Sequence, residues 1–184
     1  MSRQIIKTRG FGAGGKNTNK NGLSFEARTC LSSRIRQRFT RKGTELIRFR
    51  NCNKELVCVD KSKLFTYMKK INELNLDIKP AKGCKRPDEA YIDLTNKHLF
   101  IIEKKFQQRP GSVEEKIQTG HFKQIHYNKL FPNYDVKYIY CLNEWFKNGF
   151  ESELEYLEQF GINVFWGDSD SYKVDLIKFI KNYK

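Results

Sequence analysis

The sequence has few of the residues that cross-link a chain, bind zinc or span a membrane. Its 184 residues include 4 prolines, 3 histidines and 5 cysteines, and no C-x-x-C pair occurs. Spacing of this kind argues against a zinc ribbon and against a disulfide scaffold. No apolar stretch approaches the roughly 20 residues that a membrane span needs, and the opening "MSRQIIKTRGFGAGG" has no apolar signal region. We therefore expect an intracellular, cytoplasmic protein in a reducing compartment, with no membrane partner.

Acidic residues are scarce in the first 50 positions, where only Glu26 and Glu45 stand against 13 lysines and arginines. The whole chain carries a formal net charge of +14. A domain this basic predicts a polyanionic partner, although a basic arm that only keeps a protein soluble would have the same composition. The stretch 10–22 is rich in glycine and asparagine, so residues 1–22 are expected to form a flexible basic arm.

Two common nucleotide- and metal-binding motifs are absent. The segment "GFGAGGKNTN" would need Ser or Thr where Asn17 stands to form a phosphate-binding loop, which excludes an NTPase of that type. The histidines His98, His121 and His126 have no H-E-x-x-H arrangement and are interpreted as structural.

Hydrophobic periodicity predicts one α/β domain over residues 23–184, with a mixed central sheet flanked by helices. Helices are expected over 23–39, 61–75, 112–130, 151–161 and 171–183, and the first of these carries a row of arginines. Strands are expected over 44–51 and 54–60 as one hairpin, over 90–94 and 98–106 as a second hairpin, and over 135–142 and 162–166.

The second hairpin brings together residues that suit metal-assisted hydrolysis. Strand alternation places Glu103 and Lys105 on one face, and a two-residue turn at Asn96-Lys97 would pair Asp88 with Lys105 across the hairpin. Any nearby register brings Asp88 to the same end. Two converging carboxylates favour a hard cation such as Mg²⁺, and an adjacent lysine can hold a water. The alternative is a solvated hairpin with a cross-strand ion pair.

This stretch resembles the PD-(D/E)xK nuclease motif, with Pro87-Asp88 followed after 14 residues by Glu103-Lys104-Lys105. The segments "GAGGKNTN...GLSFE" and "FQQRPGSVEEKIQTGHFKQIHYNKLFPN" are also similar to small type II restriction endonucleases of that superfamily. The resemblance implies a restriction-endonuclease-like core, with residues 23–184 forming a single PD-(D/E)xK nuclease domain.

The resemblance also implies roles for individual residues. Asp88 and Glu103 would be metal ligands, with the Lys104 carbonyl as a third, and Lys105 would position the attacking water. Glu26 resembles the additional acid that many such nucleases place beside the metal. Gln124 stands where related enzymes use a polar residue near the scissile phosphate, and Gln118 is an equally good occupant. Residues expected to contact DNA are Lys16, Asn17, Asn19, Arg34, Arg36, Arg38 and Arg41.

The resulting expectation is a Mg²⁺-dependent type II restriction endonuclease acting on double-stranded DNA, with Mn²⁺ as a substitute metal. Double-strand cutting favours a homodimer, which gives each DNA strand its own active site, and a monomer that nicks sequentially is the alternative. One alternative is a structure-directed or repair nuclease of the same fold, and a less favoured one is a non-catalytic basic DNA-binding protein.

Overall fold

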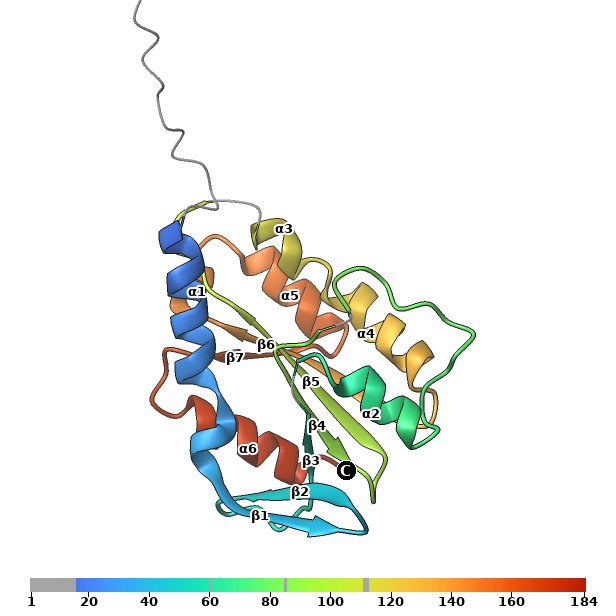
Figure 1. Ribbon diagram of the computed structural model, residues 1–184. Coiled ribbons are helices and arrows are strands. Elements are labelled where there is room, and N and C mark those ends of the chain that lie inside the picture. Colours follow the sequence, from blue (N-terminus) through green and yellow to red (C-terminus); the bar gives the residue numbers. More distant parts are fainter. Residues whose placement is uncertain (1–15, 60, 85, 111–112) are drawn as a thin grey trace, which may run out of the picture.

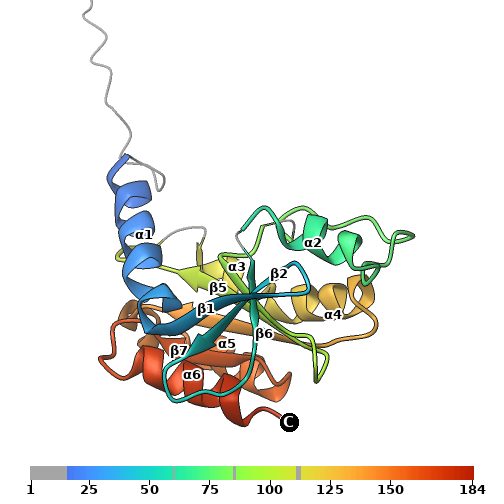
Figure 2. The same ribbon diagram turned by 60° about the horizontal axis from the view of Figure 1, so that its bottom comes forward.

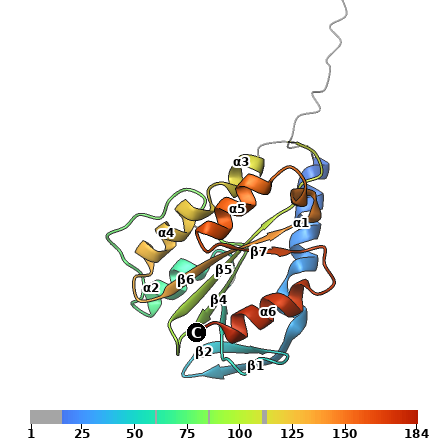
Figure 3. The same cartoon turned by 180° about the vertical axis from the view of Figure 1, so that it is seen from behind.

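Helices cover both faces of a five-stranded mixed sheet, and a separate two-stranded sheet lies at one end of it (Figures 1 and 3). The computed structural model describes residues 16–59, 61–84, 86–110 and 113–184, with side chains described from Lys20 onward except at positions 113 and 114. The elements in chain order are α1 (Lys16–Thr29), the 3-10 turn η1 (Leu31–Arg34), β1 (Ile35–Arg41), β2 (Thr44–Phe49), β3 (Val57–Val59), α2 (Leu64–Lys70), β4 (Glu89–Asp93), β5 (His98–Lys105), α3 (Val113–Ile117), α4 (Gly120–Leu130), β6 (Asp135–Leu142), η2 (Glu144–Lys147), α5 (Glu151–Gln159), β7 (Asn163–Trp166) and α6 (Tyr172–Asn182).

The main sheet has the order β3-β4-β5-β6-β7. Its first three strands are antiparallel neighbours, whereas β5, β6 and β7 run parallel to one another. The central strands β5 and β6 pair along their whole length, from His98 opposite Asp135 to Lys105 opposite Leu142. The strand β6 is a nearly continuous apolar run and β5 contains one over residues 99–102, which suits strands that are buried on both faces. The expected α/β fold with a mixed sheet flanked by helices is therefore confirmed.

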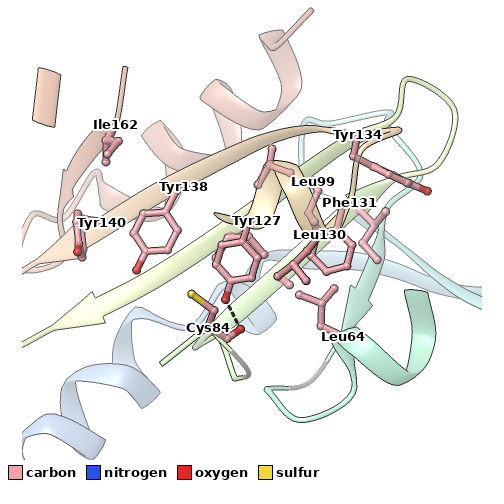
Figure 4. Close-up of a cluster of buried hydrophobic side chains, with 14 of the residues drawn as sticks. Leu64, Cys84, Leu99, Tyr127, Leu130, Phe131, Tyr134, Tyr138, Tyr140 and Ile162 are labelled. Carbon is pink, nitrogen blue, oxygen red and sulfur yellow. Dashed lines mark hydrogen bonds between the residues drawn. The ribbon is translucent and has the colours of Figure 1, made fainter. Parts of the chain in front are cut away.

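One face of the sheet is covered by α2, α4 and α5. The core on this side includes Leu64 and Met68 of α2, Leu130 of α4 and Leu157 of α5. Figure 4 shows how Tyr127 of α4 reaches across this cluster, where its hydroxyl donates a hydrogen bond of 2.7 Å to the Cys84 carbonyl. That bond fixes the loop that leads into β4 against the helix layer.

The opposite face is covered by α1 and α6. Phe25 of α1 and Leu176, Ile177 and Ile180 of α6 lie in one buried cluster with the other faces of β4, β5 and β6. Gly167, in the loop from β7 to α6, lies so close to α1 that a Cβ atom there would stand 2.5 Å from Cζ of Phe25 and 2.8 Å from the Sγ of Cys141. The absence of a side chain at Gly167 therefore allows α1 to dock on this loop.

The expected basic helix over 23–39 is wrong in its second half. The helix α1 ends at Thr29, whose hydroxyl donates to the Phe25 carbonyl at 2.7 Å, and Cys30 takes an extended conformation with ψ of 133°. The arginines that follow lie on η1 and on β1, which pairs with β2. Arginine has a high helix propensity, so the local sequence favours a helix, and the pairing with β2 overrides that preference.

Three further expectations differ in extent or partner. The helix α1 begins at Lys16, so residues 16–22 are helical, while residues 1–15 of the expected arm lie outside the described residues. The expected hairpin of 44–51 with 54–60 is reduced to one antiparallel bridge between Ile47 and Leu56. The expected helix over 112–130 is divided into α3 and α4. The strand β2 pairs with β1 along its length, and Figure 2 shows the two strands side by side. Gly120, at the start of α4, packs closely on Tyr140.

No helix within the described ranges is both long and apolar enough to cross a membrane.

We expect Gly167→Ala to destabilise the protein by about 1–3 kcal/mol, because the added methyl group overpacks the contact with α1. The matched control is Gly22→Ala within α1, where a Cβ meets no atom within 4 Å. This change should raise the free energy of unfolding by up to about 1 kcal/mol through helix propensity. Urea unfolding followed by circular dichroism measures both, and equal stability of the Gly167 variant and the wild type would contradict the close packing.

Candidate functional site

The β4–β5 hairpin places Asp88 directly across from Glu103. Glu89 pairs with Ile102, so the same register carried one residue further sets Asp88 opposite Glu103, with both side chains on one face. The expected two-residue turn is wrong: residues 94–97 form a four-residue turn, in which the Asp93 carboxylate accepts the backbone N–H groups of Thr95 and Asn96 at 3.1 and 3.0 Å. The register is thereby shifted by two residues, and Asp88 faces Glu103 and not Lys105.

Asp88 and Glu103 lie in different electrostatic surroundings. The Asp88 side chain is 15% exposed, and burial together with the negative charge of Glu103 raises its pKa. Its Oδ2 accepts the backbone N–H of Lys104 at 2.7 Å, which lowers the pKa but does not cancel the rise. Burial also acts to raise the pKa of Glu103, but the ammonium groups of Lys105 and Lys123 outweigh it, so the pKa of Glu103 is lowered. Of these two carboxylates, Asp88 is thus the one with less charge compensation.

Two lysines hold the Glu103 carboxylate. The Lys105 ammonium lies 2.5 Å from Oε1 of Glu103 and also donates to the Lys104 carbonyl at 3.3 Å. Lys123, on α4, lies 3.2 Å from the same Oε1 and 3.1 Å from the Tyr138 hydroxyl. Sequence reasoning missed Lys123. Lys123 lies one helical turn from Gly120 and from Tyr127, which are both buried in α4. That spacing places Lys123 on the buried side of the helix and is the pattern that could have identified it.

Glu26 approaches the site through a lysine. The ammonium of Lys61, which lies between β3 and α2, forms ion pairs with the carboxylates of Glu26 and of Asp88, the latter at 3.4 Å. Burial lowers the pKa of Lys61, but the two carboxylates more than offset this and the pKa is raised. Sequence reasoning placed Glu26 beside the motif and missed Lys61, which belongs to no motif. The structure thus brings Glu26, Asp88, Glu103 and Lys105 to one end of the β4–β5 hairpin.

Lys104 points to the opposite face of β5 from Glu103 and Lys105. Its buried ammonium donates to Oε1 of Glu89 at 2.6 Å and to the backbone carbonyl of Glu26 at 2.9 Å. The second oxygen of Glu89 accepts the Tyr91 hydroxyl at 2.8 Å. These bonds attach α1 to the hairpin and so position Glu26 relative to Asp88.

The side-chain amide of Gln124 forms hydrogen bonds with backbone groups of β6 and of the end of α5. Its Nε2 donates to the Phe160 carbonyl at 3.3 Å, and its Oε1 accepts the N–H of Tyr138 at 3.2 Å. These bonds join α4 to β6 and to the end of α5. The alternative residue, Gln118, donates to Glu153 at 3.2 Å on the exposed surface. Neither amide has a contact with Asp88 or Glu103 among the described interactions.

The expected DNA-contacting arginines lie on η1 and β1. Arg38 pairs with Glu45 at 3.4 Å and Arg41 with Glu55 at 3.0 Å. Exposed pairs of this kind contribute little to stability, so exchanging a glutamate for a phosphate costs little. In the part of the chain that the structure describes, Arg34 and Arg36 form no ion pair. The side chains of Lys16, Asn17 and Asn19 lie outside the described residues.

The donor set fits a hard divalent cation with few protein ligands. Across residues 16–59, 61–84, 86–110 and 113–184, no group of three Asp, Glu, His or Cys side chains is arranged to hold a metal ion. Mg²⁺, however, is commonly bound by one or two carboxylates together with substrate phosphates. Asp88 and Glu103 supply that pair. Burial, and after it the charge of Glu103, raises the pKa of Asp88, and a bound cation would offset both effects.

No protein-family model matches the chain, and no curated protein or solved structure matches it significantly.

We expect Asp88→Asn to stabilise the protein at neutral pH. A raised pKa means that the folded state binds this proton more tightly than the unfolded chain does. Ionising Asp88 therefore costs folding stability. This cost is absent below the ordinary pKa of 3.8 and grows as the pH rises through the pKa of Asp88 in the folded state. Urea unfolding at pH 7 should therefore give a higher midpoint for D88N than for the wild type, and the difference should vanish at about pH 3.5.

Glu103→Gln is the matched control with the opposite sign. The pKa of Glu103 is lowered, so its contribution to stability is present above its ordinary pKa and is lost as pH falls through the folded value. E103Q should unfold more easily than the wild type at pH 7. A D88N variant that is also less stable than the wild type at pH 7 would contradict the assigned electrostatics.

Proposed function

We propose that this protein is a Mg²⁺-dependent endonuclease of the PD-(D/E)xK type that hydrolyses phosphodiester bonds in double-stranded DNA, as a type II restriction enzyme does. The observation that carries the proposal is the placement of Asp88 opposite Glu103 at one end of the β4–β5 hairpin, with Lys105 in contact with Glu103. A solvated hairpin would leave these charges exposed, whereas the side chains of Asp88, Glu103 and Lys105 are 15%, 12% and 17% exposed. Burying charge is costly, which favours a chemical role.

The surrounding fold supports the same proposal. The hairpin is followed by the helices α3 and α4 and then by the parallel strand β6, and Glu26 of α1 is linked to Asp88 through Lys61. This order agrees with the core that the sequence resemblance implies. The restriction-endonuclease-like assignment of the fold is part of the proposal.

The chain's own residues divide the chemistry among them. Asp88 and Glu103 would hold the metal, together with the Lys104 carbonyl. When bound, Mg²⁺ supplies charge neutralisation at the phosphoryl oxygens and lowers the pKa of a coordinated water. Lys105 donates a hydrogen bond from its ammonium to the attacking water and orients it. Lys123 holds Glu103 in its ionised form, which is the form that can be a ligand.

The charge distribution supports a DNA substrate. Thirteen lysines and arginines in the first 50 residues attract a polyanion, while the site itself combines carboxylates with Lys61, Lys105 and Lys123 and is close to neutral. Arg34, Arg36, Arg38 and Arg41 belong to the proposed DNA-contacting surface, now placed on η1 and β1. A homodimer remains part of the proposal because two chains would give each DNA strand its own active site, and a monomer that nicks the strands one after the other is the alternative.

Asp88→Ala and Glu103→Ala should each abolish cleavage, because either change removes half of the carboxylate pair. Lys105→Ala should lower the cleavage rate by about 100-fold or more, as loss of a positioned proton donor does. The measurement is nicking and linearisation of supercoiled plasmid with Mg²⁺ or Mn²⁺, alongside binding of a DNA duplex in metal-free buffer. Gln118→Ala is the control and should cleave normally.

Full activity of the Asp88 or Glu103 variant would overturn the proposal. Sequencing the ends separates the alternatives: a reproducible cut at one sequence supports a restriction enzyme, and cutting only at branched or damaged DNA supports a structure-directed nuclease. Duplex binding without cleavage by the wild type under any divalent metal would support the non-catalytic alternative.

Lys61→Met should increase the affinity of the site for the metal. The ammonium of Lys61 lies 3.4 Å from Asp88 and competes with a cation for that carboxylate, so its removal frees the ligand. Titration of Mn²⁺ into the DNA-free protein by calorimetry should show a dissociation constant several-fold below that of the wild type. Lys69→Met, on the exposed side of α2, removes the same charge elsewhere and should change the constant much less. Weaker Mn²⁺ binding by K61M would instead make Lys61 a supporting residue.

A further inference from the structure

A polar hollow of about 510 Å³ lies between the end of α1, η1 and the loop from β7 to α6. Figures 1 and 3 both show that loop beside the C-terminal end of α1. Four basic residues from four different segments line the hollow, and we call them the basic pocket: Arg28, Arg34, Arg50 and Lys173. A volume of this order falls within the range of about 300–1,000 Å³ that is typical of small-molecule sites.

Most of this positive charge has no carboxylate partner. Arg28 is the exception, since it pairs with Asp168, whose other oxygen accepts the N–H of Glu144 at 2.9 Å. Lys173 donates to the Ser33 hydroxyl at 2.9 Å, which is a neutral partner. Within the described ranges, no carboxylate pairs with Arg34, Arg50 or Lys173.

One further carboxylate, Asp170, lines the hollow. Three uncompensated cations therefore face one uncompensated carboxylate, and the hollow attracts an anion.

The backbone around the pocket is tied in place. The N–H of Arg50 donates to the carbonyl of Arg34 at 2.9 Å, so the two guanidinium groups project from neighbouring points. Gly167 forms part of the lining and is packed against Phe25 and Thr29 of α1, and its N–H donates to the Leu142 carbonyl at 2.8 Å. A pocket whose walls are already fixed loses little entropy when a ligand binds.

We propose that the basic pocket binds a phosphate group. Guanidinium groups match the geometry of phosphate oxygens with paired N–H donors, and Ser33 and Ser169 add hydroxyl groups to the lining. An apolar ligand has little to contact, because the one aromatic ring in the lining, Tyr172, is itself buried. The phosphate is either a backbone phosphate of bound DNA, in which case the inference rests on the proposed function, or part of a free phosphate compound.

The test variant is Arg34→Gln combined with Arg50→Gln, and the matched control is Lys69→Gln combined with Lys70→Gln. The control removes the same two charges from α2, which packs on the other face of the sheet. In EDTA, affinity for a DNA duplex is measured at several salt concentrations. Separately, inorganic phosphate is titrated while the side-chain Nε–H signals of Arg34 and Arg50 are followed by NMR.

If DNA supplies the phosphate, the R34Q/R50Q variant should bind the duplex more weakly, with a salt slope shallower by about 1, and the control should keep the wild-type slope. If the source is a free phosphate compound, the duplex affinity stays unchanged while inorganic phosphate shifts the arginine signals saturably. Unchanged duplex binding without such a shift overturns the proposal, as do equal losses in both variants. Displacement of the signals by poly-glutamate but not by phosphate also overturns it, in favour of an acidic peptide.

Cleavage of plasmid by R34Q/R50Q with Mg²⁺ at low salt reports separately on the proposed nuclease function. If R34Q/R50Q still cleaves plasmid but binds the duplex with the shallower salt slope, the pocket contributes to DNA binding and not to catalysis. A wild-type protein that binds phosphate at the pocket but never cleaves DNA contradicts the nuclease proposal alone.

Discussion

Lys104 carries a buried ammonium on which the geometry of the candidate site depends. With its side chain 2% exposed, the ammonium bonds to Glu89 of β4 and to the Glu26 carbonyl of α1, while its backbone N–H bonds to Asp88. One residue thus links two strands, a helix and a carboxylate of the site. Buried ion pairs seldom add net stability over apolar replacements, because desolvation offsets most of the attraction. The pair instead fixes positions, because the Lys104 ammonium holds the Glu26 backbone against β5. Since side chains alternate along a strand, Glu103 and Lys105 lie on the opposite face of β5 from Lys104.

The two carboxylates of the hairpin, Glu103 and Asp88, are compensated unequally by neighbouring positive charges. Glu103 is held by two lysines that are themselves largely buried, Lys105 and Lys123, so its charge is secured by the fold. Asp88 has only Lys61 as an ionic partner in the described part of the chain, and the Lys61 side chain is 48% exposed. A pair with one exposed partner is weak and screened by salt. Asp88 can therefore be released from its lysine partner more easily than Glu103 can, and it is also the carboxylate whose pKa is raised.

Most of the fold could be predicted from the sequence, because hydrophobic periodicity reports burial directly. The apolar runs of β5 and β6 and the amphipathic pattern of α6 each identified an element that the structure contains. The arginine-rich segment after Thr29 was misassigned, since arginine suits a helix and only the pairing with β2 makes it a strand. The site was located from the alternation of Glu103 and Lys105, but the turn that sets its register depends on the Asp93 side chain. Lys61 and Lys123 come from other segments, and no local pattern joins them to the motif.

The helix α1 separates opposite charges that would otherwise neutralise one another. In a chain with a net charge of +14, carboxylates are expected to acquire arginine partners, which would block them as ligands. Glu26 and Arg28 are two residues apart, so they lie about 200° apart around the helix. Glu26 reaches Lys61 and the site, whereas Arg28 reaches Asp168 and the basic pocket. Phe25 is buried between these two sides and packs on Phe106. The packing of α1 therefore directs the Arg28 guanidinium away from the site, and in the described part of the chain the ion-pair partner of Asp88 is a lysine, Lys61. A lysine is a single point charge without the paired donors of arginine, so it is the cation more readily exchanged for a metal ion.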